Sequence, residues 1–172
     1  MKRLTAIAIT AALATATAAL SAQSPDASVC TTASPVNLDF TVKDLNGRDV
    51  RLNGFGGKVL VVNFWATWCA PCRVEIPAFM DLYRRYRPLG VEMIGIAADE
   101  PPDVLRPYVR EMKMNYPVLI GRGRQEVLDS FGPLLGMPTT VIVNRDGTLC
   151  QRYVGFQRKQ TFEDLLKQLT KS

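Results

Sequence analysis

The sequence predicts a mixed α/β domain whose central sheet is covered by helices on both faces. Two apolar runs, 59–64 and 91–97, have the length and the continuous hydrophobicity of strands that are buried on both sides. A segment with helical spacing of apolar residues follows each run, and the chain ends with a predicted hairpin and a final helix. Strands that alternate with helices in this order form a sheet between helical layers.

The first 22 residues have the pattern of a secretory signal peptide. Lys2 and Arg3 form a basic start, residues 4–20 are apolar and rich in Ala and Thr, and small residues follow. We therefore expect export to the periplasm, with cleavage near residues 21–23, or a membrane anchor if the signal stays uncleaved. No other apolar run in the sequence approaches the roughly 18 residues that a membrane-spanning helix needs.

The remaining chain has the size of one domain. Residues 23–35 are mainly Ser, Thr, Ala and Pro, which predicts a flexible lead-in to a domain at 36–172. A chain of this length buries about 68 to 70% of its unfolded surface, so one core is enough. Loss of Lys2 and Arg3 with the signal leaves 19 of the 21 basic residues against 16 acidic ones. They are scattered, without aromatic residues interleaved on one face, so we expect no nucleic-acid partner.

The first predicted strands form a hairpin. Apolar and polar residues alternate over 38–42 and 50–52, and Asn46-Gly47 supplies the turn. The glycine-rich segment 53–58 comes before a strand. A phosphate-binding loop needs its glycines between a strand and a helix, so we interpret 53–58 as a connector.

Helical segments lie on either side of the predicted strand 91–97. The first follows Cys72 and contains Pro77, which predicts a kink. The second covers 99–114 and contains Pro107, which is expected to delay or bend the helix. The positions with core-facing spacing are Ile76, Phe79, Met80, Tyr83 and Tyr86 in the first segment and Val104, Tyr108 and Met112 in the second.

The last part of the domain is predicted to contain two further strands after a short strand and a short helix. These segments are a strand at 117–120, a helix at 126–131, and strands at 140–143 and 148–154. Asn144-Arg145-Asp146-Gly147 joins the last two strands as a hairpin. Thr161 and Asp164 form a capping box that predicts the start of the closing helix. Inward-facing residues are Val127, Leu128 and Phe131 in the short helix and Phe162, Leu165, Leu166 and Leu169 in the closing one.

The motif Cys69-Ala70-Pro71-Cys72 lies where the buried run 59–66 turns into a helix. Two thiols at this spacing are typical of a redox-active dithiol, which forms a Cys69–Cys72 disulfide when it is oxidised. The free N–H groups and positive dipole end of the helix favour a thiolate at Cys69, and cysteines in this setting have pKa values lowered from about 8.5. Pro71 suits a first helical turn, and Cys72 is expected to be the less exposed sulfur.

A zinc site is the alternative for this cysteine pair. A four-cysteine site needs a second closely spaced pair, whereas Cys30 and Cys150 stand alone and the chain has no histidine. We therefore expect no metal and no cofactor.

Two motifs carry a resemblance to a known family. The run FWATWCAPC at 64–72 and the run GMPTT at 136–140 resemble the thioredoxin superfamily, in particular its TlpA/ResA/CcmG-like branch of extracytoplasmic thiol-disulfide oxidoreductases. The resemblance extends over about 40–169. It implies a thioredoxin-like fold with a central mixed sheet flanked by helices, an N-terminal β-hairpin and a central βα insertion.

The resemblance also implies roles in thiol-disulfide exchange. Cys69 is the expected nucleophile, and Cys72 resolves the mixed disulfide. Glu75 lies one helical turn after Cys72, and a glutamate at this offset is implicated in proton handling in ResA-like proteins. Thioredoxins use an aspartate on the preceding strand, where this chain has Asn63, which cannot exchange a proton. The alternative for Glu75 is an ordinary exposed helix residue.

Four residues are expected to bind a client protein around the dithiol, namely Trp68, Pro71, Met137 and Pro138. Pro138 matches the family's cis-proline, whose backbone, with that of Met137, offers an edge for an extended peptide. Trp68 is expected at the surface, whereas Trp65, inside the apolar run, is expected in the core.

Cys30 and Cys150 are expected to form a structural disulfide in an oxidising compartment. This bond would tie the N-terminal lead-in to the last hairpin, and closing so long a loop would stabilise the fold by on the order of 4 kcal/mol. Some TlpA-like proteins have such an extra pair. The alternative is two separate thiols, with Cys150 buried and Cys30 free.

The sequence favours a monomeric reductant of specific partner disulfides. By resemblance, its clients are apocytochrome c, with its paired haem-binding cysteines, or a copper-site assembly protein, and a membrane thiol donor re-reduces the dithiol. One alternative is a general oxidant of folding proteins, but these usually have a histidine between the cysteines, and Ala70-Pro71 lacks that charge. The other is a copper-binding chaperone without redox turnover, because a cysteine pair can bind Cu(I). Related assembly factors also use a histidine ligand, which this chain lacks.

Overall fold

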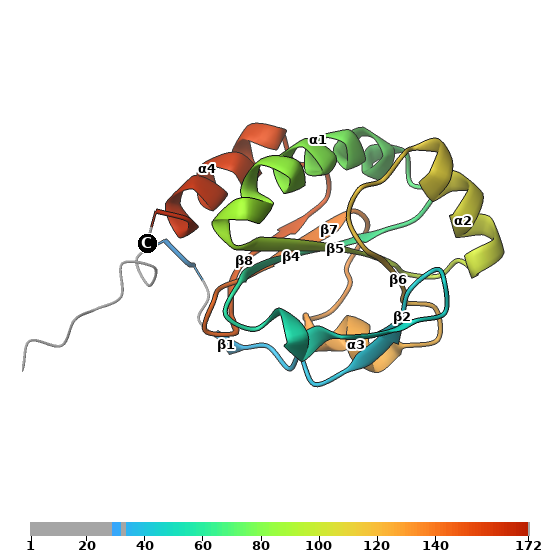
Figure 1. Cartoon of the computed structure of the whole chain (residues 1–172), viewed down its shortest axis with the longest axis horizontal. Helices are drawn as coiled ribbons and strands as arrows, with labels where there is room; N and C mark the ends of the chain where they lie inside the picture. Colours follow the sequence, from blue (N-terminus) through green and yellow to red (C-terminus); the bar gives the residue numbers. More distant parts are fainter. Residues whose placement is uncertain (1–28, 32–33, 172) are drawn as a thin grey trace, which may run out of the picture.

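The computed structural model describes residues 29–31 and 34–171, so the predicted signal peptide, 1–22, lies outside the described residues. A six-stranded sheet lies between two layers of helices and loops (Figure 1). Its strands are β1 (Ser34–Pro35), β4 (Val59–Trp65), β5 (Val91–Ala97), β6 (Val118–Ile120), β7 (Thr139–Val143) and β8 (Thr148–Val154). The helices are α1 (Ala70–Tyr86), α2 (Pro102–Glu111), α3 (Gln125–Ser130) and α4 (Lys159–Leu169). Within the described ranges, no helix is both long and apolar enough to span a bilayer.

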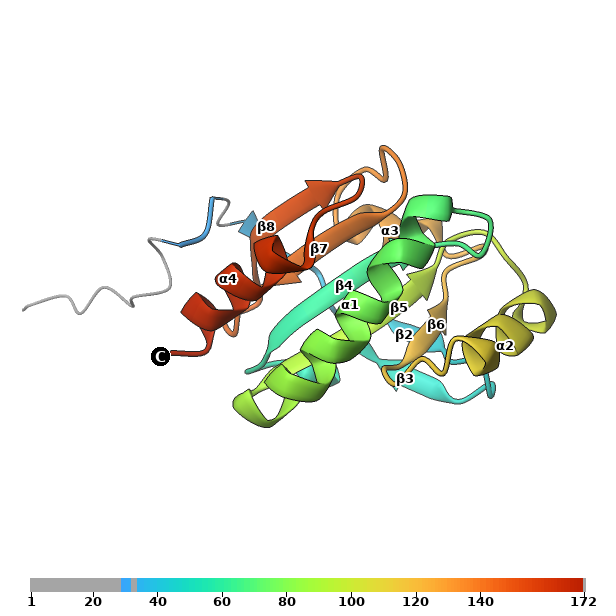
Figure 2. The same ribbon diagram turned by 90° about the horizontal axis from the view of Figure 1, so that it is seen from above.

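The sheet is mixed, as predicted, with the strand order β1-β8-β7-β4-β5-β6. β4 is central and fully buried, and it pairs parallel with β5 and antiparallel with β7. α1 connects β4 to β5 and crosses above them, with α4 beside it (Figure 2). Phe64 pairs with Thr139, and Thr139 pairs with Val154, so the end of β4, the start of β7 and the end of β8 share one edge of the sheet.

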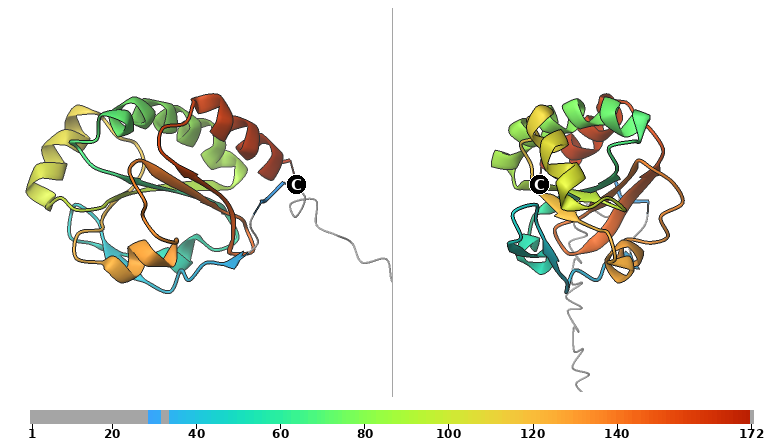
Figure 3. Two further views of the ribbon diagram at one scale, coloured as in Figure 1. Left: turned by 180° about the vertical axis from the view of Figure 1, so that it is seen from behind. Right: turned by 90° about the vertical axis from the view of Figure 1, so that its right-hand side faces the viewer.

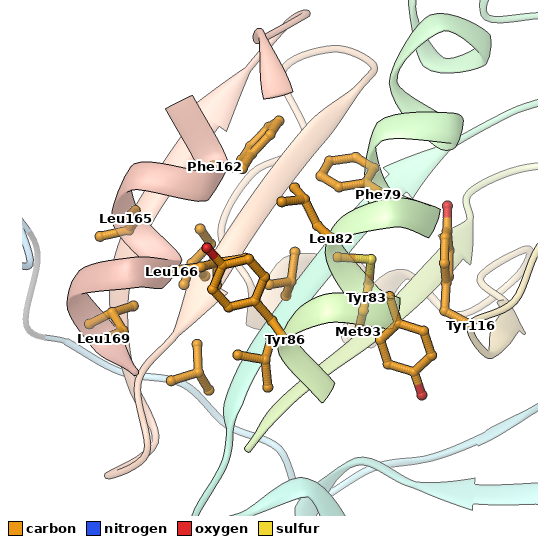
Figure 4. Packing of buried hydrophobic residues seen from close by; sticks show 14 of the residues in the cluster. Phe79, Leu82, Tyr83, Tyr86, Met93, Tyr116, Phe162, Leu165, Leu166 and Leu169 are labelled. Atoms are coloured by element: carbon orange, nitrogen blue, oxygen red, sulfur yellow. The ribbon is translucent and has the colours of Figure 1, made fainter. Parts of the chain in front are cut away.

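Apolar side chains fill both faces of the sheet. On the face under α1 and α4, the rings of Phe79 and Phe162 lie 4.8 Å apart and join the two helices (Figure 4). On the other face, the ring of Phe64 meets that of Phe131 edge-on at 5.7 Å. This second face is covered by α3 and the N-terminal segments (Figure 3). The continuous hydrophobicity of the central strands follows from burial on both sides.

The N-terminal hairpin and the central insertion are present as predicted. β2 (Thr41–Lys43) and β3 (Asp49–Arg51) pair antiparallel, and the connector to β4 contains a short 3-10 helix (Leu52–Phe55). α2, β6 and α3 lie between the β4-α1-β5 unit and the closing β7-β8-α4 unit, and this part of the chain contains the βα insertion. A second 3-10 turn (Arg87–Leu89) ends α1.

The predicted capping box of the closing helix is wrong. α4 begins at Lys159 with Arg158 at its N-cap, so Thr161 already lies inside the first turn. The Thr161 backbone N–H donates to the Arg158 carbonyl, and Asp164 accepts a hydrogen bond from Gln160 instead of completing a box. The N-cap, Arg158, therefore lies three residues earlier than the Thr161 that the motif predicts.

The prolines do not break the helices that contain them. α1 is continuous through Pro77, and α2 runs from Pro102 through Pro107. Of the three core positions predicted in the α2 segment, Tyr108 and Met112 pack partly buried against the core, whereas Val104 is 42% exposed and its neighbour Leu105 is buried instead. The helix starts at Pro102, in the first turn, where a proline is well tolerated.

The predicted Cys30–Cys150 disulfide is present. Ser34 of β1 pairs with Leu149 of β8, and the Thr31 backbone N–H donates to the Cys150 carbonyl at 3.1 Å. The described residues 29–31 and 34–35 therefore lie against β8, held by the covalent bond and the strand pairing.

Candidate active site

The dithiol lies at the junction of β4 and α1, at the sheet edge shared with the ends of β7 and β8. Cys69 is the N-cap of α1, and its Sγ accepts a hydrogen bond from the Cys72 backbone N–H at 3.3 Å. A disulfide joins the two residues. Cys69 is 4% exposed and Cys72 is 1% exposed, so Cys72 is the less exposed sulfur, as predicted. On reduction, the free N–H groups of the helix would stabilise a thiolate at Cys69.

Glu75 is a buried carboxyl on the inner side of α1, with 2% of its surface exposed. Its Oε1 accepts a hydrogen bond from the Gln157 backbone N–H at 2.6 Å, and its Oε2 has no partner among the described residues. Burial raises the pKa of Glu75 to about 7, and the hydrogen bond from Gln157 opposes this rise. An exposed helix glutamate, the alternative interpretation, is excluded by this burial.

Asn63 is buried on β4, at the position where thioredoxins have their aspartate. Its Nδ2 donates to Thr140 Oγ1 at 3.0 Å, which joins β4 to β7 through side chains. This contact uses the amide as a structural donor. Glu75 is thus the acid that the described fold buries on the helix carrying the cysteines.

The Met137–Pro138 peptide bond is cis, as the resemblance implies. Met137 packs, partly buried, against the cluster that contains Cys69 and Cys72. The Pro138 carbonyl accepts a hydrogen bond from the Gly155 backbone N–H at 2.7 Å. The loop before β7 is therefore fixed beside the dithiol by the loop after β8.

The two tryptophans lie where the sequence predicts them. Trp65 is fully buried, and its ring packs against that of Tyr108 on α2 at 5.5 Å. Trp68, immediately before Cys69, is 63% exposed. Trp68 is therefore free to contact a protein that approaches the disulfide, and Trp65 supports the sheet from inside.

Two polar contacts at the site were not predicted from the sequence. Glu100, in the loop between β5 and α2, accepts hydrogen bonds from the backbone N–H and the hydroxyl of Thr67. The Gln157 backbone holds Glu75 from the loop before α4. These partners lie 33 and 82 positions apart in the chain, and no local spacing connects them.

Exposed apolar side chains gather at the same edge. Besides Trp68, the exposed large apolar residues at this edge are Val74, Leu135, Val154 and Phe156, which we call the apolar rim. A Cβ on Gly136 would lie 3.9 Å from Val154, and the Glu75–Gln157 contact brings the neighbouring residues of α1 and the β8–α4 loop together. These residues stand outside any periodic pattern, so the sequence does not indicate their grouping.

The dithiol edge differs from the cavity-lined end of the molecule. A cavity of about 640 Å³ lies at the far end of α1, between the β2-β3 turn and the side chains of Tyr83 and Arg87. Neither cysteine lines that cavity. A disulfide at a sheet edge that carries an apolar rim suits exchange with another polypeptide better than capture of a small molecule.

Known proteins are similar to this chain in sequence and in fold. The model of the AhpC/TSA family matches residues 35–152. The chain belongs to this family of thioredoxin-like proteins. The thiol-disulfide oxidoreductase ResA of Bacillus thuringiensis subsp. konkukian is 36% identical over 132 residues, which cover 77% of this chain and 75% of the relative.

Solved structures have the same fold. A thiol:disulfide interchange protein of the thioredoxin family from Chlorobium tepidum superposes with a TM-score of 0.71 and 28% identity, over 81% of this chain and 96% of that one. A thiol:disulfide interchange protein from Bacteroides sp. has a TM-score of 0.72 at 23% identity, over 84% and 93% of the two chains, and shows the fold alone. The predicted resemblance to ResA-like proteins, and with it the predicted thiol-disulfide oxidoreductase activity, is confirmed.

Proposed function

We propose that this oxidoreductase is a periplasmic reductant that passes electrons from Cys69 and Cys72 to disulfides of specific partner proteins. The observation that carries the proposal is the position of Cys69 at the N-cap of α1, with its sulfur on the Cys72 N–H. This position favours the attacking thiolate in the reduced protein. The residues between the cysteines carry no charge that would stabilise the thiolate further, which favours a reductant over an oxidant.

The exchange proceeds in two balanced steps. The Cys69 thiolate attacks one sulfur of the client disulfide, forms a mixed disulfide and releases one client thiolate, which takes up a proton. Cys72 loses its proton and attacks the Cys69 sulfur, which releases the second client thiolate. The client gains two electrons and two protons, and the protein is left with the Cys69–Cys72 disulfide.

Glu75 is the proposed acceptor of the Cys72 proton. It lies one turn from Cys72 on α1, and its Oε2 is free of any hydrogen bond within the described chain. A carboxyl with a pKa of about 7 exchanges protons near neutral pH, where a normal glutamate would stay ionised.

The client is proposed to bind across the dithiol edge as an extended segment. Met137 and Pro138 supply the backbone edge, and Pro71, Trp68 and the apolar rim supply side-chain contacts. By family resemblance, the clients are apocytochrome c or a copper-site assembly protein, and the electrons come from a membrane thiol donor. Export through the predicted signal peptide would place the protein in the periplasm, or on the membrane if the signal remains.

The proposal is tested by trapping the client. In the native host, Cys72→Ser should accumulate a mixed disulfide through Cys69, because the resolving thiol is missing. Cys69→Ser is the matched control and should trap nothing. A captured protein with a reducible cysteine pair would support the proposal, and equal adducts from both variants would contradict it.

Acid-quenched alkylation of the wild-type protein tests the direction of electron flow. A reductant is expected to hold Cys69 and Cys72 as thiols in the cell. A dithiol found oxidised at steady state would overturn the reductant function in favour of an oxidant.

A metal titration alongside an insulin-reduction assay tests the copper-chaperone alternative. Tight Cu(I) binding with no reduction of insulin disulfides would favour the copper chaperone.

A further inference from the structure

The turn that leads into the dithiol is held by an acid from another loop. Glu100 follows β5, and its Oε2 accepts the Thr67 backbone N–H at 2.6 Å, while its Oε1 accepts the Thr67 hydroxyl. A third bond, from the Ala98 N–H to the carbonyl of Trp65 at 3.1 Å, joins the residue after β5 to the last residue of β4. Glu100 therefore fixes the turn from which Cys69 caps α1.

The contacts of Glu100 are those of a carboxylate. Both of its oxygens accept hydrogen bonds, and the backbone N–H of Thr67 can only donate. No ion pair to Glu100 occurs within residues 29–31 and 34–171. A negative charge without a paired cation is thus bonded to Thr67, which lies two residues before Cys69 in the chain.

We propose that Glu100 is a positioning residue of the dithiol and that its charge keeps the Cys69–Cys72 couple reducing. A thiolate exists only in the reduced protein, so a nearby negative charge raises the free energy of the reduced form relative to the neutral disulfide. The equilibrium moves toward the disulfide, and electrons pass more readily to a partner. This role of Glu100 rests on the proposed function and gives a cause for the direction of electron flow.

Other charged groups around the dithiol act on the same equilibrium. Arg73, one residue after Cys72, is exposed and carries the opposite charge. Arg73 and Glu100 act on the pKa of Tyr108 on α2 in opposite directions, Arg73 lowering it and Glu100 raising it. Asp99 is exposed beside Glu100, and Glu75 lies buried inside α1. Of these groups, Glu100 is the one whose carboxyl bonds to the turn before Cys69. Its contribution is separated from the others by a change that removes the charge and keeps the hydrogen bonds.

Glu100→Gln is that change. The glutamine carbonyl can accept the Thr67 N–H, and its amide can donate to the Thr67 hydroxyl. The full-length protein is equilibrated with reduced and oxidised glutathione, in which one dithiol and one glutathione disulfide exchange two electrons and two protons. We expect the equilibrium to shift about 3- to 10-fold toward the reduced protein, and the pH midpoint of Cys69 thiolate absorbance to fall.

Asp99→Asn is the matched control, since it removes a neighbouring exposed charge that does not bond to the motif. We expect it to shift the equilibrium by less than about 2-fold. The proposed charge effect would be overturned if Glu100→Gln left the equilibrium and the midpoint unchanged and only Glu100→Ala slowed the exchange. Glu100 would then act only through its hydrogen bonds to Thr67. If the wild-type couple itself proves oxidising, the reductant function fails, but the sign of the Glu100→Gln shift still tests this inference.

Discussion

Glu75 links burial at the site to the pH dependence of stability. Burial raises its folded-state pKa from 4.5 to about 7. The unfolded chain therefore loses this proton near pH 4.5, whereas the folded protein keeps it until about pH 7. Folding stability falls as the pH rises through this window. Above about pH 7 the raised pKa has lowered the free energy of unfolding by its full amount, on the order of 3 kcal/mol.

Glu75→Gln should remove this pH dependence, because the amide does not ionise and can still accept the Gln157 N–H. Urea unfolding of the oxidised protein at about pH 4.5 and about pH 8 measures it, and the wild type should lose on the order of 3 kcal/mol more than the variant. Glu126→Gln, at an exposed position on α3, is the control and should behave as the wild type. Parallel pH profiles for Glu75→Gln and the wild type would contradict the raised pKa.

Local spacing predicts the residues of the site that lie close together in the chain. Cys69, Cys72 and Glu75 follow one another at helical intervals, and the helix junction explains their chemistry. The partners Glu100 and Gln157 come from other loops, and only the folded sheet edge brings them to the motif. Burial of Glu75 likewise depends on the loop before α4, which the sequence does not position.

At the scale of elements, the Cys30–Cys150 disulfide fastens the N-terminal segment to β8. The two residues are 120 positions apart, so the bond closes a long loop in the unfolded chain. Cys30→Ala/Cys150→Ala should lower the free energy of unfolding by on the order of 4 kcal/mol. Urea unfolding under non-reducing conditions measures the loss. Cys69→Ala/Cys72→Ala, which opens a much shorter loop, should lose less, and an equal loss in both variants would contradict the argument.

Periodicity predicts the elements themselves but not all of their ends. The buried strands and the apolar faces of α1, α3 and α4 follow from period-2, continuous or helical patterns. The start of α4 at Lys159 is missed because its first turn is polar and has no side-chain cap. In the α2 segment, Tyr108 and Met112 face the core as their spacing predicts, but Leu105 is buried in place of Val104.

At the scale of the whole molecule, the apolar rim lies at the same sheet edge as the dithiol. If a polypeptide client binds there, Phe156→Ser and Leu135→Ser should each lower kcat/KM for insulin disulfides by about 5-fold, through loss of buried apolar area. Exchange with oxidised glutathione, which is too small to cover the rim, should be unchanged. Leu89→Ser, at an exposed site in the 3-10 turn at the other end of α1, is the control. Equal losses for both substrates would show that the rim residues act on the dithiol and not on the client.

The layered arrangement of the molecule is predictable, since strands alternate with helices and the family motifs agree with that order. The grouping of the apolar rim is not predictable from the sequence, because its residues come from α1, the loop before β7, β8 and the loop after β8. Their isolated positions look like ordinary exposed residues in the sequence. Only the pairing of β7 with β4 and β8 brings them to one edge.

The central claim is that Cys69, held at the N-terminus of α1, is the sulfur that attacks. The most direct test is the pH dependence of iodoacetamide alkylation of Cys69 in the reduced Cys72→Ser protein, with reduction of insulin by Cys69→Ser measured in parallel. We predict that Cys69 alkylates with a midpoint below the ordinary thiol value of about 8.5 and that Cys69→Ser does not turn over. A midpoint at or above that value, together with retained turnover in Cys69→Ser, would contradict the claim.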